Sequence, residues 1–224
     1  MSIILSIETA TTNCSVSLSK DGETFALKED YNKGYSHAER LHVFIEELLL
    51  ENAIKKSQIN AIAVSKGPGS YTGLRIGVSA AKGLCYALGI PLISVSTLES
   101  LAHQVEASEG FIVSMLDARR MEVYAEVFDV KHNSVRDIEA EILTENSYEF
   151  FLQNGLVHFI GNAVAKTKTI ISHSNAVFIE NKLPSASEMG ALAYHKYKKS
   201  DIEDVAYFEP YYLKDFVALK PKSK

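Results

Sequence analysis

The sequence predicts an α/β protein with two tandem lobes, each a mixed sheet that opens with three antiparallel strands and is flanked by helices. Apolar segments with strand and helix periods alternate through the first half of the chain, which is typical of parallel strands joined by helices. The pattern of strand, polar turn and strand at residues 3–22 returns from residue 111, which indicates an internal duplication. The 224 residues, 46% of them hydrophobic, suffice for two modest cores.

The first lobe is expected to begin with a three-strand meander. Short apolar runs predict strands at residues 3–7, 14–19 and 23–29. A Thr-rich turn at 9–13 and a hairpin turn at Lys20-Asp21-Gly22 separate them. Strands that follow one another through short turns pair in an antiparallel manner.

Helices and parallel strands follow the meander. Ser36 and Glu39 form a capping-box pattern ahead of a helix at residues 37–52, whose apolar residues recur at helical spacing. The sequence then predicts a strand at 61–64, a helix at 71–88, a strand at 91–95 and a short helix capped at Ser96 or Thr97. This order gives a mixed sheet with helices on its faces.

The second lobe repeats the opening strands and then carries shorter elements. After the strand–turn–strand repeat, we expect a third strand at about 135–143, a short helix near 145–153, a strand at 157–161 and a helix within 185–199. We place the boundary in the segment "EASEG", so that the lobes are residues 1–106 and 107–224.

Four phrases of the sequence are distinctive: "LSIETATTNCSVSL", "KGPGSYTGLRIGVSAAKGLCYALGIPLISVSTLESLA", "MLDARRMEVYAEVF" and "YLKDF". They closely resemble the TsaB (YeaZ) family, a subunit of bacterial tRNA threonylcarbamoyladenosine synthesis. The two-lobe design is that of the actin-like (ribonuclease H-like) ATPase superfamily. The long central phrase is the most specific of the four, and residues 130–185 are not diagnostic.

The resemblance implies two actin-like lobes and a non-catalytic partner for a TsaD-type transferase, which moves a threonylcarbamoyl group onto adenosine in certain tRNAs. It also implies a TsaE-type ATPase as a further component, and contact with tRNA through the complex rather than directly. In this family the helices equivalent to 37–52 and 71–88 form a four-helix bundle with the same pair on the transferase. The alternative is an enzyme of the same fold, either a small-molecule kinase or ATPase or a glycoprotease-like peptidase.

Small residues at spacings of three and four along the helix 71–88 predict a surface for close helix packing. Glycine inside a helix costs about 0.5–1 kcal/mol relative to alanine, so Gly77 and Gly83 need a compensating reason. Packing on the chain's own sheet accounts for some of these positions, and a partner interface is expected to account for others. The predicted interface comprises Leu41, Phe44, Ile45, Leu48, Tyr71, Gly73, Leu74, Arg75, Gly77, Val78 and Ala81.

Three features extend this prediction. Val43 and Leu50 carry apolar surface beyond the main stripe of the helix 37–52. A self-complementary surface of this kind also permits a homodimer. Arg75 lies near the helix start, where the macrodipole disfavours a cation, and we expect it to have a carboxylate partner in this chain or across the interface.

The first turn predicts a vestigial phosphate-binding site, formed by Glu8, Thr9, Thr11 and Thr12. In actin-like ATPases this turn offers backbone N–H and hydroxyl groups to a nucleotide phosphate. The matching turn of the second lobe carries Asp117, Arg119 and Arg120, and such bulky side chains obstruct close approach to a phosphate. We therefore expect the geometry without nucleotide hydrolysis. Whether these three residues form a salt-bridged turn or contact a partner or tRNA is left open.

The sequence predicts no catalytic residue, metal site or cofactor. Where the related transferase has two metal-binding histidines, this chain has Thr97 and Leu101, and leucine cannot coordinate a cation. Residues 67–74 lack the lysine of a P-loop. Ser70 is interpreted as a helix cap rather than a nucleophile.

Charge and composition bound the cellular setting. The chain has 23 basic and 28 acidic residues and no long basic run, which argues against an autonomous nucleic-acid binder. Cys14 and Cys85 are expected to be reduced core residues. No apolar run reaches the length of a signal or membrane segment, so we expect a cytoplasmic protein without membrane association.

Overall fold

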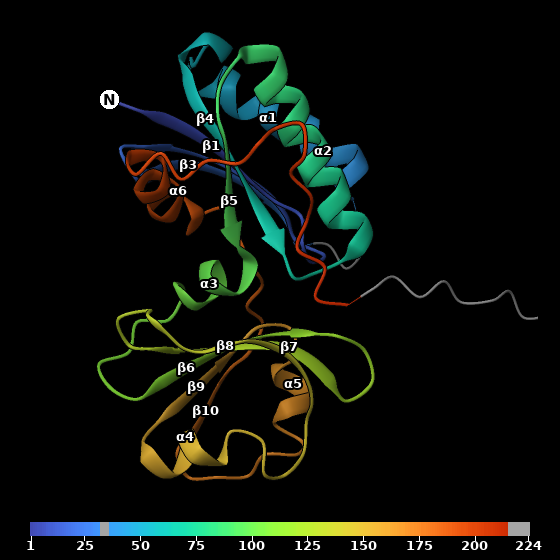
Figure 1. The fold of residues 1–224 in the computed structure, drawn as a ribbon, viewed down its shortest axis with the longest axis vertical. Helices are drawn as coiled ribbons and strands as arrows, with labels where there is room; N and C mark the ends of the chain where they lie inside the picture. Colours follow the sequence, from blue (N-terminus) through green and yellow to red (C-terminus); the bar gives the residue numbers. More distant parts are fainter. Residues whose placement is uncertain (32–35, 215–224) are drawn as a thin grey trace, which may run out of the picture.

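The computed structural model describes residues 1–31 and 36–214, and it forms two five-stranded sheets stacked along the long axis of the molecule (Figure 1). The first sheet consists of β1 (Ile3–Glu8), β2 (Cys14–Lys20), β3 (Glu23–Asp30), β4 (Ile59–Gly67) and β5 (Leu92–Ser96). Its strand order is β3-β2-β1-β4-β5, in which the first three strands are antiparallel and β1, β4 and β5 are parallel. This is the predicted mixed sheet.

Helices cover both faces of the first sheet. On one face lie α1 (His37–Glu51) and α2 (Tyr71–Leu88), and on the other lies α6 (Met189–Lys198), as Figure 1 shows. Successive residues of a strand point to opposite faces, so Leu5 and Ile7 of β1 pack with α1 and α2 while Ile4 packs with α6. A strand buried on both faces is predominantly apolar, which explains the run "IILSI" at the N-terminus.

The second sheet repeats the topology of the first. It consists of β6 (Phe111–Asp117), β7 (Glu122–Asp129), β8 (Ser134–Ile142), β9 (Val157–Ile160) and β10 (Ala176–Ile179), in the order β10-β9-β6-β7-β8. As in the first sheet, the first strand pairs antiparallel with the second and parallel with the fourth. The shared order confirms that both lobes have the predicted sheet design.

The helices of the second lobe are much shorter than those of the first. One face of its sheet packs against α4 (Glu149–Asn154) and α5 (Val164–Thr167), and the other packs against α3 (Thr97–Ala102), which lies between the lobes. The four residues of α5 stand where the first lobe has the eighteen residues of α2. Neither α5 nor β10 nor the 3₁₀ turn at Lys56–Gln58 was predicted, because segments this short carry a weak periodic signal, although the equally short β9 was predicted from its apolar residues.

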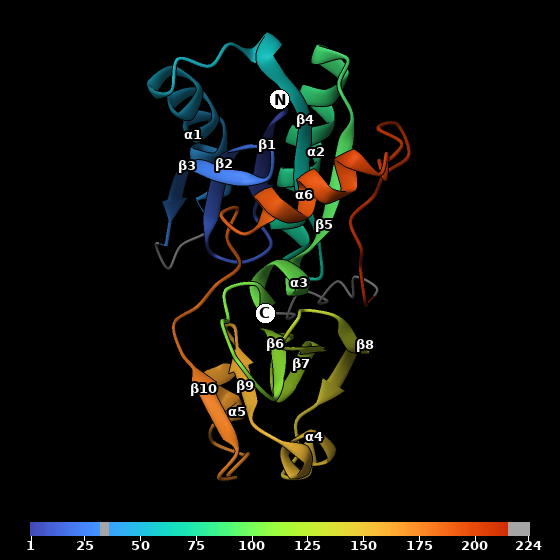
Figure 2. The same ribbon diagram turned by 90° about the vertical axis from the view of Figure 1, so that its left-hand side faces the viewer.

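After β10 the chain returns to the first lobe (Figure 2). Ala186 anchors the return: its carbonyl accepts from Ser17 Oγ at 2.6 Å, and its N–H donates to Ser15 Oγ at 2.9 Å. α6 then packs against β1, β4 and β5, and Glu203 bridges to Leu92 of β5. Residues from 186 to the last described residue, 214, thus lie largely against the first lobe, although the sequence-based division at 106/107 assigned them to the second.

Candidate functional site

The segment that leads into α2 packs closely on the turn between β1 and β2. Ser70 caps the helix as predicted, since its Oγ accepts from the N–H of Gly73 at 3.3 Å. The N–H of Ser70 in turn donates to the carbonyl of Ala10 at 2.7 Å. A Cβ on Gly69 would lie 2.5 Å from that same carbonyl oxygen, so only glycine fits there.

Gly73 and Gly77 are required by packing within this chain. A Cβ on Gly73 would collide with the carbonyl oxygen of Thr9, and a Cβ on Gly77 would collide with the Thr9 hydroxyl. The Thr9 hydroxyl donates to the carbonyl of Gly73 at 2.8 Å. The first turn of the chain is therefore held directly against the bare face of α2.

Most of the predicted interface residues belong to the first core. The structure buries nine of the eleven, which are Leu41, Phe44, Ile45, Leu48, Gly73, Leu74, Gly77, Val78 and Ala81. These side chains therefore face the interior of this chain, and a contact of the same helices with a partner stays a prediction. The physical reason is that the strongest apolar stripe of an amphipathic helix covers its own sheet, and periodicity alone does not say which surface the stripe meets.

The outward sides of α1 and α2 form a different surface, which we call the α1–α2 groove. It has a volume of about 690 Å³ and is lined by His42, Tyr71, Thr72, Arg75, Ile76, Ser79, Ala80, Gly83 and Leu84. An added Cβ on Gly83 would meet no atom within 4 Å. Gly83 therefore has no packing role inside the described chain, in contrast to Gly73 and Gly77.

Large apolar side chains lie exposed on both helices. Leu50 of α1 is 79% exposed and Tyr86 of α2 is 87% exposed. Val43 of α1 is also exposed, as the sequence predicted for the apolar surface beyond the main stripe. Single exposed apolar residues are ordinary on protein surfaces, but several on two neighbouring helices are typical of a contact surface.

Arg75 contacts an aromatic side chain of its own helix, and a carboxylate partner across an interface stays a prediction. Its guanidinium donates to the hydroxyl of Tyr71 at 2.7 Å and lies 5.1 Å from the centre of the same ring. Within residues 1–31 and 36–214 it forms no ion pair with a carboxylate. Tyr71 lies one turn before Arg75 on α2, so the pair stiffens one wall of the groove.

A second recess, the interlobe cleft, lies between the two lobes. It has a volume of about 530 Å³, and its walls come from the β1–β2 turn, the start of α2, the β6–β7 turn and residues 211–214. Of the predicted phosphate turn, Thr11 and Thr12 line this cleft. Glu8 and Thr9 are fully buried beneath it.

Glu8 ties the first turn to the sheet. Its Oε1 accepts from the N–H of Ala10 at 2.5 Å and from Ser65 Oγ at 3.0 Å. Its Oε2 has no hydrogen-bond partner among the described residues. Burial raises the pKa of Glu8 to about 7, because an ionised carboxylate is poorly solvated inside the protein.

The β6–β7 turn of the second lobe is held by Lys166, a residue that the sequence did not single out. Lys166 Nζ lies 2.7 Å from Asp117 Oδ1 and also donates to the carbonyl of Arg120 at 3.0 Å. Asp117 accepts from the N–H of Arg119 at 2.7 Å, and both arginines have a positive φ. Asp117 thus pairs with Lys166 rather than with an arginine side chain, and α5 supplies the lysine.

The positions that would bear metal ligands are part of the packing between the lobes. Thr97 and Leu101 are fully buried on α3, and the Thr97 hydroxyl accepts from the N–H of Gly67 at 3.2 Å. In the part of the chain that the structure describes, no three His, Cys, Asp or Glu side chains are grouped so as to hold a metal ion. His103 stacks on His132 with ring centres 4.1 Å apart, a contact that sequence separation concealed.

The remaining expectations from the sequence concern cysteines and membranes. Cys14 and Cys85 are free and buried. No helix within the described ranges is long and apolar enough to cross a membrane. Part of the phrase "YLKDF" and the lysine-rich end of the chain lie outside the described residues.

Comparison with known proteins places these features in a family. A family model described as "TsaD: tRNA N6-adenosine threonylcarbamoyltransferase" matches residues 33–222. The tRNA threonylcarbamoyladenosine biosynthesis protein TsaB of Escherichia coli is 31% identical over 97% of this chain and 96% of that protein, and its namesake from Haemophilus influenzae is 29% identical over 97% and 95%.

Solved structures agree with the sequence relatives. YeaZ from Pseudomonas aeruginosa superimposes with a TM-score of 0.82 at 24% identity, over 95% of this chain and all of that one, which establishes the shared fold. A second structure, described as similar to peptidase YeaZ from the same organism, gives 0.81 at 25% identity over 96% of this chain. Near-complete coverage at these identities means that the chain belongs to the TsaB (YeaZ) family.

Proposed function

We propose that this chain is a non-catalytic subunit of bacterial tRNA threonylcarbamoyladenosine biosynthesis, and that it docks on a TsaD-type transferase through the α1–α2 groove. The observation that carries the proposal is Gly83. Glycine inside a helix is costly, yet no neighbour in the described chain occupies the space beside it. A partner helix packed into the groove supplies the missing reason.

The choice of partner follows from the relation between the two chains. A TsaD family model matches residues 33–222 of this chain, so the transferase and this protein share a fold. Two related chains can present the same helix pair to each other about a twofold axis, as identical subunits do in a symmetric dimer. Small residues such as Ala80 and Gly83 let the helix axes approach closely.

The interlobe cleft favours a non-catalytic role for this chain. Thr9 is engaged with α2, Glu8 with Ser65, and Asp117 with Lys166, so these three polar side chains have partners within the chain. Of the predicted phosphate turn, Thr11 and Thr12 face the cleft. The catalytic groups of the reaction then belong to the transferase. The proposal includes a TsaE-type ATPase in the same complex, and its setting is the cytoplasm, where bacterial tRNA is modified.

Transfer RNA reaches the complex through the other subunits in this proposal. The chain has a formal net charge of -5, and phosphate backbones bind to positively charged surfaces. A homodimer through the same groove is the competing arrangement when the transferase is absent.

The test is reconstitution with a groove variant and a matched control. Ser79→Glu places a carboxylate on the exposed wall of the groove, and Ala191→Glu places the same charge on the exposed side of α6. We expect Ser79→Glu to weaken binding to a TsaD-type protein by about tenfold or more, while Ala191→Glu binds like the parent chain. Equal affinity of both variants would overturn the groove as the docking site.

Activity assays separate this proposal from the enzymatic alternatives. With each component omitted in turn, tRNA modification should require both this chain and the transferase. ATP hydrolysis or peptide cleavage by the purified chain alone would favour a kinase, ATPase or peptidase of the same fold and contradict the proposal.

A further inference from the structure

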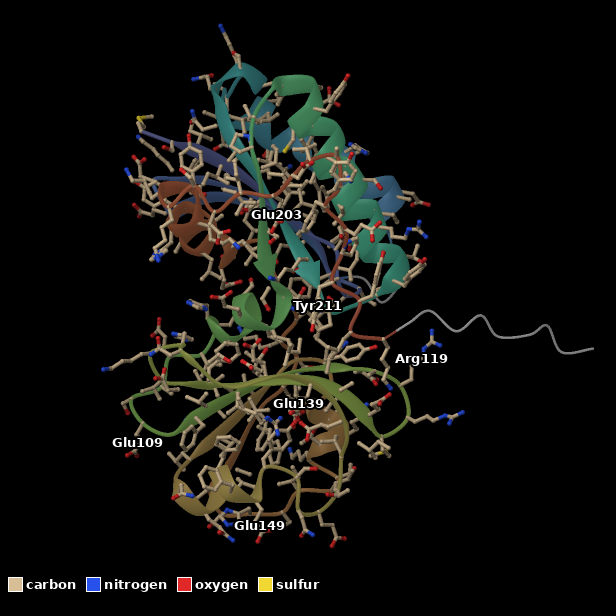
Figure 3. The ribbon with its side chains drawn as sticks, in the orientation of Figure 1. Glu109, Arg119, Glu139, Glu149, Glu203 and Tyr211 are labelled. Atoms are coloured by element: carbon tan, nitrogen blue, oxygen red, sulfur yellow. The ribbon has the colours of Figure 1, made fainter. Side chains whose placement is uncertain are left out.

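Residues 203–214, the last that the structure describes, form a strap that runs from the first sheet to the second lobe. It begins at the edge strand β5, where the N–H of Glu203 donates to the carbonyl of Leu92 at 2.8 Å. Figure 3 shows Glu203 beside β5 and Tyr211 at the junction of the lobes, above Arg119 of the second lobe. The strap thus runs from the edge strand of the first sheet to the junction of the lobes.

Three contacts fasten the strap to the first lobe. Lys82 Nζ, on α2, donates to the carbonyls of Ala206 and Phe208 at 3.1 and 2.9 Å. The Phe208 side chain packs against the first core. Further on, the N–H of Tyr211 donates to the carbonyl of Lys66 at 2.7 Å. The strap is therefore anchored on the first lobe well before it reaches the cleft.

The far end of the strap lies across the interlobe cleft. Tyr212 packs on Tyr71 with ring centres 5.0 Å apart, and Lys214 forms an ion pair with Glu122 at the start of β7. All four residues from Tyr211 to Lys214 line the cleft. One end of the strap is thus held by the first lobe and the other by the second.

We propose that the strap is a latch that holds the interlobe cleft closed. Closure depends on the contacts at both ends of the strap, the hydrogen bonds from Lys82 of α2 and the Lys214–Glu122 ion pair on the second lobe. Because Tyr71 lines both the cleft and the α1–α2 groove, the latch also positions one wall of the groove. This second part rests on the proposed docking function, whereas the first does not.

A cysteine introduced at the cleft reports the state of the latch. Thr12 lines the cleft, and its replacement by cysteine gives a thiol whose reaction rate with a maleimide measures access. The native Cys14 and Cys85 are buried, and burial raises the pKa of each thiol to about 12, so they contribute a slow background. The rate in the denatured chain gives the upper limit.

Charge reversal tests the second-lobe end. Lys214→Glu should raise the labelling rate of the Thr12→Cys reporter about three- to fivefold, the factor that an exposed ion pair contributes. Adding Glu122→Lys restores an attractive pair and should return the rate to the parent value. A double variant that labels as fast as the single one would overturn the latch.

Loss of the first-lobe anchor tests the remote end. Lys82→Ala removes the two hydrogen bonds to the strap carbonyls, and Lys82 itself does not line the cleft. This variant should also raise the labelling rate about threefold or more. The control, Lys131→Ala at an exposed turn, should leave the rate unchanged. A chain ending after Phe208 should label about tenfold faster, and a chain ending after Lys214 should label at the parent rate. Unchanged labelling in Lys82→Ala and in the shorter chain would refute the proposal.

Affinity for the transferase distinguishes the latch itself from its proposed effect on the α1–α2 groove. We expect Lys214→Glu to weaken binding of a TsaD-type protein about threefold, and Glu122→Lys to restore it. Faster labelling with unchanged affinity would overturn the link to the groove and leave the latch. Absence of any complex with the parent chain would instead refute the docking function, and the labelling rates would still decide the latch.

Discussion

Gly77 and Gly83 lie on the same helix, and their replacement by alanine should have opposite effects on stability. An added Cβ at Gly83 meets no atom within 4 Å, so Gly83→Ala gains the helix propensity of alanine, about 0.5–1 kcal/mol. For a chain of this size each kcal/mol moves the midpoint of thermal unfolding by about 2–4 °C. We expect the midpoint of Gly83→Ala to rise by about 1–4 °C.

At Gly77 the same methyl group meets the Thr9 hydroxyl. To admit it, α2 must shift or Thr9 must give up its hydrogen bond to Gly73, and overpacking of this kind costs about 1–3 kcal/mol. The gain in propensity offsets only part of that cost. We expect the unfolding midpoint of Gly77→Ala to fall by several degrees, measured by circular dichroism on the isolated chain.

A larger side chain at Gly83 separates stability from docking. Gly83→Leu should unfold no more easily than the parent chain, yet bind a TsaD-type protein about tenfold or more weakly, because the isobutyl group fills the groove. Ala191→Leu, at an exposed site of α6, is the control. Unimpaired binding by Gly83→Leu would refute the groove, and stabilisation by Gly77→Ala would refute the packing on Thr9.

Three further predictions concern single residues. Glu8 keeps its proton in the folded chain up to about pH 7 but loses it near pH 4.5 in the unfolded chain, so the free energy of unfolding falls as pH rises through this window. Glu8→Gln should therefore stabilise the chain by about 2–3 kcal/mol more at pH 8 than at pH 5. An equal effect at both pH values would disprove the assigned pKa. Arg75→Glu should weaken the complex more than it lowers the unfolding midpoint, because Arg75 is exposed and, among the described residues, its hydrogen bond goes to Tyr71; equal losses would count against this. Leu41→Ala should cost about 2–5 kcal/mol in chemical unfolding, as befits a core residue, and a cost below about 1 kcal/mol would return Leu41 to the surface.

The sheets were predictable because strands have a local signature. The short apolar run of β1 and the turn at Asp21 and Gly22 identify the meander without reference to the rest of the chain. The repeat of that signature at β6 predicts the second sheet in the same way.

The candidate site was less predictable because it depends on which surfaces meet. Helical period shows that Leu41 and Val78 share buried stripes, but the sheet that covers them is distant in sequence. The same limit concealed the partners of Lys166 and of α6. Gly83 carried a signal, a glycine within a helix, that the sequence could not distinguish from that of Gly77.

The return of α6 to the first sheet gives this protein an unusual order of assembly on the ribosome. Synthesis proceeds from the N-terminus, so both sheets emerge before the helix that covers Ile4, Ala61 and Ile93. Until that helix is translated, the nascent first lobe exposes the hydrophobic face of its sheet, which a holdase chaperone can bind. The earliest part of the polypeptide to be made is thus among the last to be completed.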